Sequence, residues 1–246
     1  PTRGDGGNGI TMAPLSGTTT TFDLKGVSWT GPFTVNAQDS TGVVRVKQDI
    51  VGAAGGTVDS LGLFQGTLDL ATYNVNVNMA ALSISGASTR AINWGSTSTL
   101  SLSGNGGTLF FASTLTNYSY TGTQPTCVFT YTGSTSTRTI AGPSAAFSVA
   151  FTGNATDTLT MTGVFNNLSF ANFNGIVNNG SRSTFGNLTY SSTATYTTGT
   201  GTTTIYPQPG AQVSLTTNGA NTTFPLAING TGNVTLVGNY VCNALS

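Results

Sequence analysis

Short segments in which apolar and polar residues alternate run along most of the chain. An alternation with a period of two is typical of β-strands that have one buried and one solvated face. The clearest segments are residues 67–70, 75–77, 100–102, 128–131, 147–151, 159–161, 168–170, 213–215 and 234–236. The pattern therefore predicts an all-β protein built from many short strands.

Many of these segments end in a small polar residue followed by glycine. Glycine permits positive φ, and a Thr, Ser or Asn side chain supplies the local hydrogen bond of a turn. The glycines concerned often recur after roughly the length of one strand and its turn, or about twice that length: Gly104, Gly122, Gly133, Gly153, Gly163, Gly175, Gly219 and Gly230. The spacing predicts a turn after almost every strand.

A longer repeat is also present. The segment 88–92 returns as 136–140, and a looser copy follows at 181–185. Degenerate self-similarity of short strands and glycine turns is typical of solenoids, in which each coil buries its apolar side chains on its neighbours. We predict a parallel β-solenoid (β-helix) with about 20–24 residues per coil, and ladders of Thr, Ser and Asn between coils.

A β-sandwich or jelly roll is the alternative fold. Strands spaced about ten residues apart also suit antiparallel hairpins in two facing sheets. The solenoid accounts for the degenerate repeat and for the absence of long connections, and the sandwich accounts for neither. The two folds differ in strand direction, which is parallel in a solenoid and antiparallel in a sandwich.

Charge is scarce and unevenly distributed. Only 14 of the 246 residues are charged, about 6%, whereas an ordinary soluble domain has about 25%. Ten of the 14 lie before residue 70, and residues 183–246 contain none. We expect residues 1–65 to form a lead-in and a first, more charged set of β coils. Residues 66–246 are expected to form the repetitive solenoid, continuous with the first part.

The composition also removes most catalytic chemistry. The chain has no His and no Glu, so a His-assisted nucleophile and a His-based metal site are excluded. A zero net charge without a basic face argues against nucleic acid as a partner, and no apolar stretch is long enough to span a bilayer. We expect no catalytic, cofactor-binding or metal-binding residues, and two separate thiols at Cys127 and Cys242.

One carboxylate pattern leaves an alternative open. Asp39, Asp49, Asp59 and Asp69 follow one another at intervals of ten. With a coil of about 20 residues, Asp49 and Asp69 would stack ~5 Å apart, the separation that retaining glycosidases use. We favour the interpretation that these aspartates are turn residues, because Asp is common in turns and stacked like charges repel.

Aromatic and arginine residues offer two further candidate surfaces. Several aromatic side chains could stack on sugars, although their alternating positions favour core or ladder roles: Trp29, Trp94, Tyr118, Tyr120 and Tyr131. The arginines of the repeated segment, Arg90, Arg138 and Arg182, are expected to form a solvated ladder on one edge. A binding stripe is the less favoured alternative.

Several short segments of the sequence resemble a repeat found in large phage virion proteins. Residues 66–77 are similar to that family's strand pair GTLDLNGYTLT, residues 82–95 to the strand SxSNTRTINFG that follows it, and residues 100–107 to its LTGNG turn. Residues 165–170 (FNNLSF) and 185–190 (FGNLTY) are similar to the segment TFNNLTY of that family. The resemblance covers about residues 60–190. Bacterial surface adhesins contain similar short segments.

This resemblance implies a tail-fibre, tailspike or head-fibre-like β-solenoid, which in such proteins is often trimeric. It predicts a non-enzymatic structural protein at the virion surface, a stiff rod with a polar surface. Its partners would be further copies of itself or other virion proteins, with host-surface polysaccharide as a candidate ligand. A bacterial cell-surface adhesin and a glycan-cleaving tailspike are the two alternatives.

Overall fold

The computed structural model describes residues 3–4, 9–25, 29–52, 60–84, 86–104, 107–111, 115–130, 137–141, 143–144, 147–153, 157–178, 180–197, 201–220 and 225–239. Their regular structure consists of β-strands, with no helix. The chain divides into two compact units. Unit 1 comprises residues 1–105 and 109–126, and unit 2 comprises residues 106–108 and 127–246. The expected boundary between residues 65 and 66 falls inside one strand, β8 (Ser60–Asp69).

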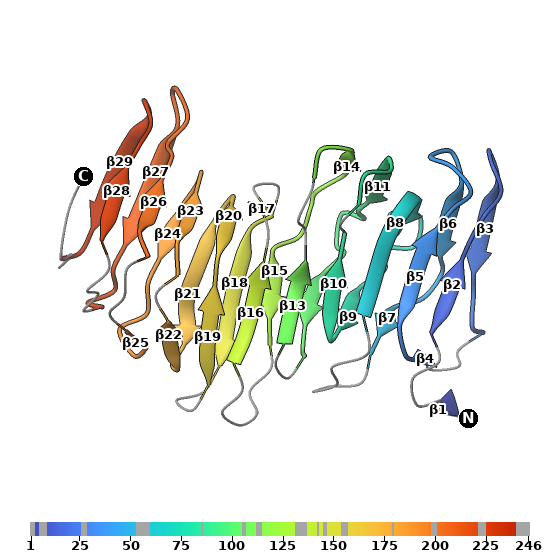
Figure 1. Ribbon diagram of the computed structural model, residues 1–246, viewed down its shortest axis with the longest axis horizontal. Helices are drawn as coiled ribbons and strands as arrows, with labels where there is room; N and C mark the ends of the chain where they lie inside the picture. The colour runs from blue at the N-terminus through green and yellow to red at the C-terminus, as the bar shows by residue number, and fades with distance from the viewer. Residues whose placement is uncertain are drawn as a thin grey trace. The chain divides into compact units, whose positions relative to one another are not determined.

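Unit 1 is built from three stacks of parallel strands, each of which receives a strand from successive coils (Figure 1). Stack 1a contains β2 (Ile10–Met12), β5 (Phe33–Asn36), the first half of β8, β10 (Ala81–Ser83) and β13 (Gly107–Phe111). Stack 1b contains β3 (Thr19–Phe22), β6 (Val43–Val46), the second half of β8, β11 (Arg90–Asn93) and β14 (Tyr118–Thr121). Stack 1c contains β7 (Ile50–Val51), β9 (Val77–Met79) and β12 (Leu100–Leu102), and β1 (Arg3–Gly4) pairs with β4 (Trp29–Thr30).

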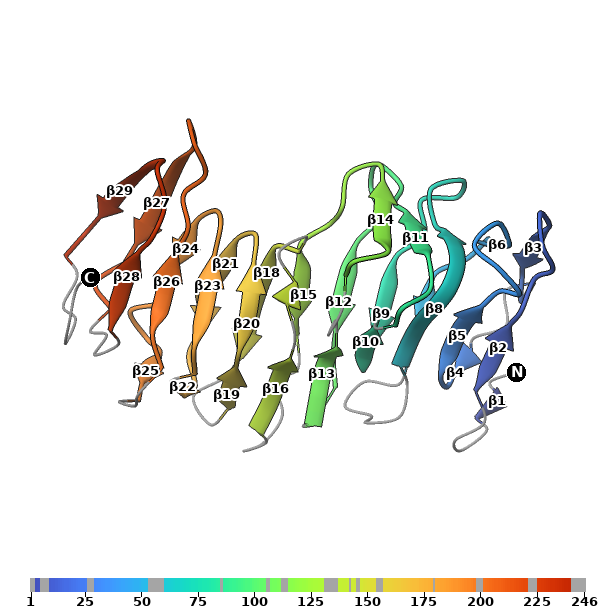
Figure 2. The same ribbon diagram turned by 45° about the horizontal axis from the view of Figure 1, so that its top comes forward.

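Unit 2 repeats the arrangement, again with three stacks (Figure 2). Stack 2a contains β16 (Thr137–Ala141), β19 (Thr158–Met161), β22 (Ile176–Asn178) and β25 (Thr195–Tyr196). Stack 2b contains β17 (Pro143–Ser144), β20 (Gly163–Phe165), β23 (Arg182–Thr184), β26 (Thr203–Ile205) and β28 (Leu226–Ile228). Stack 2c contains β15 (Cys127–Phe129), β18 (Val149–Gly153), β21 (Leu168–Phe173), β24 (Leu188–Thr189), β27 (Gln212–Thr216) and β29 (Asn233–Val237).

The strand direction confirms the predicted parallel β-solenoid. Within each stack, the described strands pair in parallel with the strands one coil before and one coil after. The antiparallel facing layers of a sandwich are not formed by these strands.

The length of a coil varies along the chain. Residues that meet between consecutive coils are separated in sequence by 24 where Arg45 contacts Asp69 and by 28 where Asn93 contacts Thr121. In unit 2 the separation falls to 18 where Thr160 contacts Asn178. The strands keep their register across these steps, so the differences lie in the connections between them.

Apolar side chains form continuous columns inside each unit. In stack 1b, Val44, Leu68 and Ile92 occupy the same register position and are fully buried. In stack 2c the equivalent column is aromatic: the rings of Phe129 and Phe151 stack with centroids 4.9 Å apart, and Phe170 continues the stack at 5.4 Å. Each fully buried side chain of this kind contributes roughly 1.5–3 kcal/mol relative to an exposed one, so the columns hold successive coils in register.

The arginines of the repeated segment are not on a solvated edge, so that expectation was wrong where it can be examined. Arg90 and Arg182 are each only 1% exposed, at the inward first position of β11 and β23; the side chain of Arg138 lies outside the described residues. Arg90 is in register with Gly66, and Arg182 with Gly163, one coil earlier. A glycine in the preceding coil leaves room for the long side chain.

Hydrogen bonds to the backbone compensate the burial of Arg90. Its Nε donates to the carbonyl of Ile84 and its Nη1 to the carbonyl of Ser88, both at 2.8 Å. In unit 2 the guanidinium of Arg182 lies over the ring of Phe170, 5.9 Å from the centroid. A charged group in the interior needs such partners. Burial also lowers the pKa of Arg90 from its usual value.

Cys127 is a free, fully buried thiol in β15, as predicted for a cysteine that behaves as a small apolar residue. Burial raises its pKa, so the reactive thiolate form is disfavoured. Cys242 lies outside the described residues.

Gly66 offers a test of how tightly the coils are packed. It has a φ of 89°, and a Cβ added there would lie 2.6 Å from the Cβ of Ala37 and 2.7 Å from the carbonyl oxygen of Gly42. Gly17 also has a positive φ, 65°, but nothing lies within 4 Å of its added Cβ. We expect Gly17→Ala to lower the free energy of unfolding by about 1 kcal/mol through backbone strain alone. Gly66→Ala should lower it by about 2–4 kcal/mol, because overpacking is added.

Urea unfolding followed by circular dichroism measures both values. Equal losses for the two variants would contradict the packing described for Gly66.

Candidate functional site

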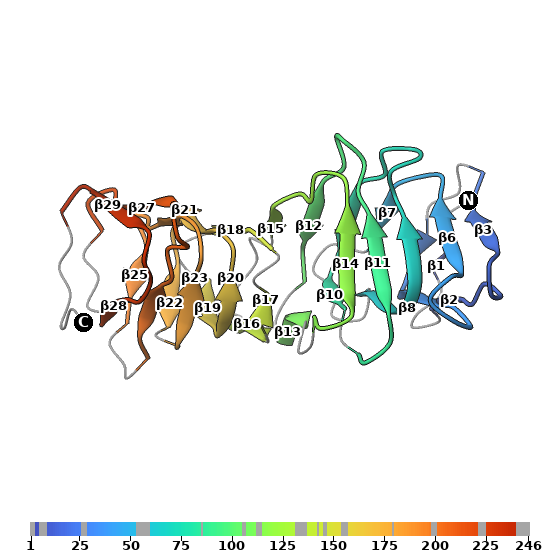
Figure 3. The same cartoon turned by 90° about the horizontal axis from the view of Figure 1, so that it is seen from above.

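The outer face of stack 1b carries the best-defined group of polar side chains in unit 1. Thr21, Arg45, Asp69, Asn93 and Thr121 occupy equivalent register positions on β3, β6, β8, β11 and β14. The last four of these strands lie side by side in Figure 3. We call these five residues the polar row. The row follows from the coil length, because its first four members recur in the sequence at one constant interval.

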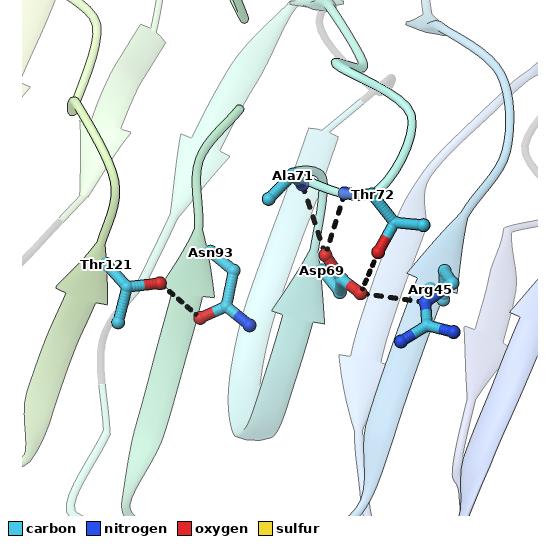
Figure 4. Close-up of polar contacts among 6 residues, drawn as sticks. All are labelled: Arg45, Asp69, Ala71, Thr72, Asn93 and Thr121. Atoms are coloured by element: carbon cyan, nitrogen blue, oxygen red, sulfur yellow. Dashed lines mark hydrogen bonds and ion pairs between the residues drawn. The ribbon is translucent and has the colours of Figure 1, made fainter. Parts of the chain in front are cut away.

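Asp69 is the centre of the polar row (Figure 4). Its Oδ2 accepts hydrogen bonds from Nε of Arg45 and from Oγ1 of Thr72, both at 2.8 Å. Its Oδ1 accepts the backbone N–H groups of Ala71 at 3.1 Å and Thr72 at 3.3 Å. The side chain of Asp69 is 7% exposed, and that of Arg45 is 38% exposed. The carboxylate thus joins two coils and closes the turn after β8.

These contacts determine the ionisation of Asp69. Burial alone would raise its pKa, but the hydrogen bonds from Arg45 and Thr72 outweigh burial and hold the pKa below its usual value. With four donors on its two oxygens, the carboxylate is a fixed anion rather than a group poised to exchange a proton. The carboxylate of Asp69 is therefore suited to holding two consecutive coils together, a role that we call the Asp69 clamp.

The polar row continues toward β14 through a neutral contact. Oγ1 of Thr121 donates to Oδ1 of Asn93 at 2.9 Å (Figure 4). Side chains in equivalent positions on parallel strands lie about 4.8 Å apart, close enough for such bonds on every step. The row therefore presents a strip of hydroxyl, amide and guanidinium groups held in place by their neighbours.

A second ladder precedes the strands of stack 1c. Asp49 accepts the backbone N–H of Asn76 on Oδ1 at 2.8 Å and the side-chain amide of Asn76 on Oδ2 at 3.2 Å. Asn76 in turn accepts the backbone N–H of Thr99 at 3.1 Å and its hydroxyl at 2.9 Å on Oδ1. Each side chain satisfies a backbone donor at the start of the next coil's strand.

Unit 2 has the same kind of ladder before the strands of stack 2c. The amide Nδ2 of Asn167 donates to Oγ of Ser148 at 2.9 Å. Oδ1 of Asn167 accepts the backbone N–H of Asn187 at 2.7 Å, and Oδ1 of Asn187 accepts that of Ser214 at 2.8 Å. These bonds confirm the predicted ladders of Ser, Thr and Asn between coils.

The structure does not stack Asp49 on Asp69. The two residues belong to different stacks, because the coils here are longer than that stacking requires: Asp69 lies opposite Arg45, and Asp49 bonds to Asn76. Asp39 closes a local turn, in which its Oδ1 accepts the backbone N–H of Thr41 at 2.8 Å. Turn roles are thus confirmed for Asp39 and Asp69, Asp49 belongs to a ladder, and Asp59 lies outside the described residues.

Local hydrogen bonds also stabilise two half-buried carboxylates of unit 1. Hydrogen bonds from Ser16 and Thr41 lower the pKa of Asp39 to about 2. The backbone N–H and ammonium group of Lys25, with help from Lys47, lower the pKa of Asp23 to about 2. Nζ of each lysine lies 3.2 Å from Oδ2 of Asp23. The two lysines therefore share one carboxylate at this end of stack 1b.

The candidate sugar-stacking aromatics have different environments. Trp94 is 2% exposed and belongs to the core, as favoured from the sequence. Tyr118 is half-buried, whereas Tyr120 is 44% exposed. The side chain of Trp29 and the whole of Tyr131 lie outside the described residues. Tyr120 is thus the candidate whose ring faces solvent.

Sequence reasoning missed the partners that complete the polar row, among them Thr72 and Asn93. A scan for polar residues that recur at the separation of Arg45 and Asp69 would have found the first four members. The glycine turns and the repeated segment 88–92 give only a range of coil lengths, about 20–24 residues, and this range does not specify which polar residues meet.

Across the ranges given above, no three His, Cys, Asp or Glu side chains gather in a way that could hold a metal ion. Nor do those ranges contain a helix long and apolar enough to cross a membrane.

Comparison with protein-family models, curated proteins and solved structures yields no match.

The polar row predicts an acid-sensitive component of stability. Because the folded-state pKa of Asp69 is depressed, its contribution is present above the unfolded pKa of about 3.9 and is lost as pH falls through the folded value. Asp69→Asn should lower the free energy of unfolding by about 1–3 kcal/mol at neutral pH and reduce its pH dependence below about pH 4.

Urea midpoints measured from pH 7 to pH 2 test this expectation. Asp49→Asn is the control, since Asp49 is exposed and its amide replacement keeps an acceptor for Asn76. If the urea midpoint of Asp69→Asn depended on pH in the same way as that of the unaltered chain, the role of the Asp69 clamp would be contradicted.

Proposed function

We propose that this chain is a structural segment of a virion surface protein, a fibre or spike of a phage, and that it has no enzymatic activity. Its task would be mechanical: a stiff, polar-surfaced solenoid that carries binding surfaces away from a particle. The observation that carries the proposal is the repeated locking of coil to coil in both units, by buried columns and by side-chain ladders.

The physical properties of such a segment suit exposure outside a cell. Backbone donors at the strand starts are satisfied by neighbouring coils, and the apolar columns are continuous through successive coils. Local unfolding would therefore break contacts on two coils together, which disfavours the openings that proteases need. The chain has few charges and no net charge, so its polar exterior has little attraction for nucleic acid and depends little on salt.

The virion location rests on short sequence segments within residues 60–190 that are similar to segments of large phage virion proteins. Bacterial adhesins contain some similar segments, and a bacterial cell-surface adhesin is the first alternative. Both functions use the same physical device, so they differ in where the chain is found rather than in how it folds.

Association with further chains is part of the proposal. The final described strand, β29, exposes Leu236 to 53% and Val237 to 47%. Leu236 occupies the register position of Leu215, which is 2% exposed one coil earlier. Apolar surface and strand edges of this kind are normally covered in an assembly. A homo-oligomer, such as the trimer common in similar virion proteins, or other virion proteins would supply that cover.

The location can be tested with an antiserum raised against the chain. Immunogold electron microscopy should show labelling on the tails or fibres of phage particles released from the host culture. Labelling confined to the bacterial cell envelope would instead establish the adhesin alternative and overturn the virion proposal.

The absence of enzymatic activity is a separate prediction. Incubation with host capsule or lipopolysaccharide should release no oligosaccharide, and Asp49→Asn should behave like the unaltered chain. Release of reducing ends that is lost in an aspartate variant would establish a glycan-cleaving spike.

A further inference from the structure

The outer face of stack 1a carries an exposed aromatic side chain, Phe64 of β8. Leu61 and Leu63 lie on the inner face of the same strand and are 0% exposed, whereas Phe64 is 42% exposed. β8 pairs in parallel with β5 on one side and with β10 on the other (Figure 2). Further strands, β2 and β13, follow on both sides. Phe64 therefore lies within the stack and not at its end.

A β-bulge sets the position of Phe64. Val35 of β5 is in register with Leu63, but the next residue of β5, Asn36, is in register with Gln65. Phe64 is thus the extra residue on β8 and has no counterpart on β5. Bulges of this kind re-aim a side chain and are frequent beside functional sites.

The ring of Phe64 lies over Gly62, two residues earlier in β8. A Cβ added at Gly62 would lie 3.1 Å from Cε2 of Phe64 and 3.3 Å from Oγ1 of Thr34. The ring edge and this hydroxyl therefore come together at one point of the outer face. On the other side of β8, Ser83 of β10 is in register with Gly62, and its neighbour Leu82 is inward and 1% exposed. Because Gly62 has no side chain, the ring can occupy the space between Thr34 and Ser83.

The groups beside the ring are polar and uncharged. The side chains of Thr34 and Ser83 are half-buried, and within the described ranges neither hydroxyl takes part in a hydrogen bond. Both hydroxyls can therefore bond to a ligand, unlike the side chains of the polar row, which bond to one another. Among the described strands of stack 1a, none contains a charged residue in the part that belongs to this stack.

We propose that Phe64, with the hydroxyls of Thr34 and Ser83, forms a binding site for a neutral saccharide. The C–H face of a pyranose would stack on the exposed ring, and hydroxyl groups of the sugar would bond to the side-chain hydroxyls on either side. An accessible apolar surface with a few placed polar groups fits this ligand chemistry. Nucleic acids and acidic saccharides would need cations to pair with their anionic groups, and the described strands of this stack supply none.

The inference rests on the proposed surface role for the source of the saccharide, a polysaccharide of the host surface. Glycan binding by the isolated chain and immunogold labelling of particles are separate measurements. Binding without labelled particles would overturn the virion location and support the site. Labelled particles without binding would overturn the site and leave the location standing.

Tyr73 provides a matched control. It is 45% exposed, against 42% for Phe64, but it lies in the turn between β8 and β9. Fluorescently labelled chain would be applied to an array of neutral and acidic glycans that includes bacterial surface polysaccharides. We expect binding to neutral glycans, at least ~10-fold weaker for Phe64→Ala and unchanged for Tyr73→Ala. Phe64→Tyr should retain most of the binding, because the stacking ring remains.

Thr34→Val tests the hydroxyl separately from the ring. Valine has a similar shape, and the hydroxyl of Thr34 makes no hydrogen bond within the described chain. The thermal melt of this variant should therefore match that of the unaltered chain, while binding to neutral glycans falls about 2–10-fold. Circular dichroism and a thermal melt of each variant establish that the coils are intact, and Thr34→Val keeps the test decisive if Phe64→Ala unfolds.

Absence of binding to every neutral glycan would overturn the proposal, as would equal binding by the unaltered chain and a folded Phe64→Ala variant. A preference for acidic glycans would also overturn it. Light scattering of the same samples measures the mass of any oligomer. If Phe64→Ala lost oligomeric mass and glycan binding were absent, this face would be a contact between copies of the chain and the saccharide site would be refuted.

Discussion

Register between consecutive coils is the constraint on which the rest of this structure depends. In a parallel solenoid every residue lies above its counterpart, so an apolar residue must meet an apolar one and a polar residue must meet a partner. Val44, Leu68 and Ile92 satisfy this requirement inside unit 1, and Arg45, Asp69 and Asn93 satisfy it outside. A slip of one residue would exchange the two sets, which makes any other alignment of these strands costly.

The same constraint explains the small number of charges. A charged side chain on one coil faces the equivalent position of two others, so it needs a specific partner on at least one of them. Arg45 has Asp69, and Lys47 has Asp23. Arg90 donates to the carbonyls of Ile84 and Ser88 and occupies the space beside Gly66. Neutral Asn, Ser and Thr avoid the difficulty because each can donate and accept along the same ladder.

The fold could be predicted from the sequence, and much of the site could not. Alternation and glycine turns are local signals: the segments at 100–102, 159–161 and 213–215 all lie in strands. Which residues meet between coils depends on coil length, and the separation of such residues ranges from 18 to 30 in the sequence. The expectation that Asp49 stacks on Asp69 was wrong because it assumed a coil shorter than the real one. The burial of Arg90 was missed because its cause, Gly66, lies one whole coil earlier.

Variable coil length has an evolutionary consequence. At the steps of 18 and 28 residues the paired strands keep their register, and the corners between them absorb the difference in length. Insertions at a corner are cheap in conformational entropy, since closure cost rises slowly with loop length. A solenoid of this type can therefore gain or lose residues at its corners one coil at a time, and change its surface while the stacked strands stay the same.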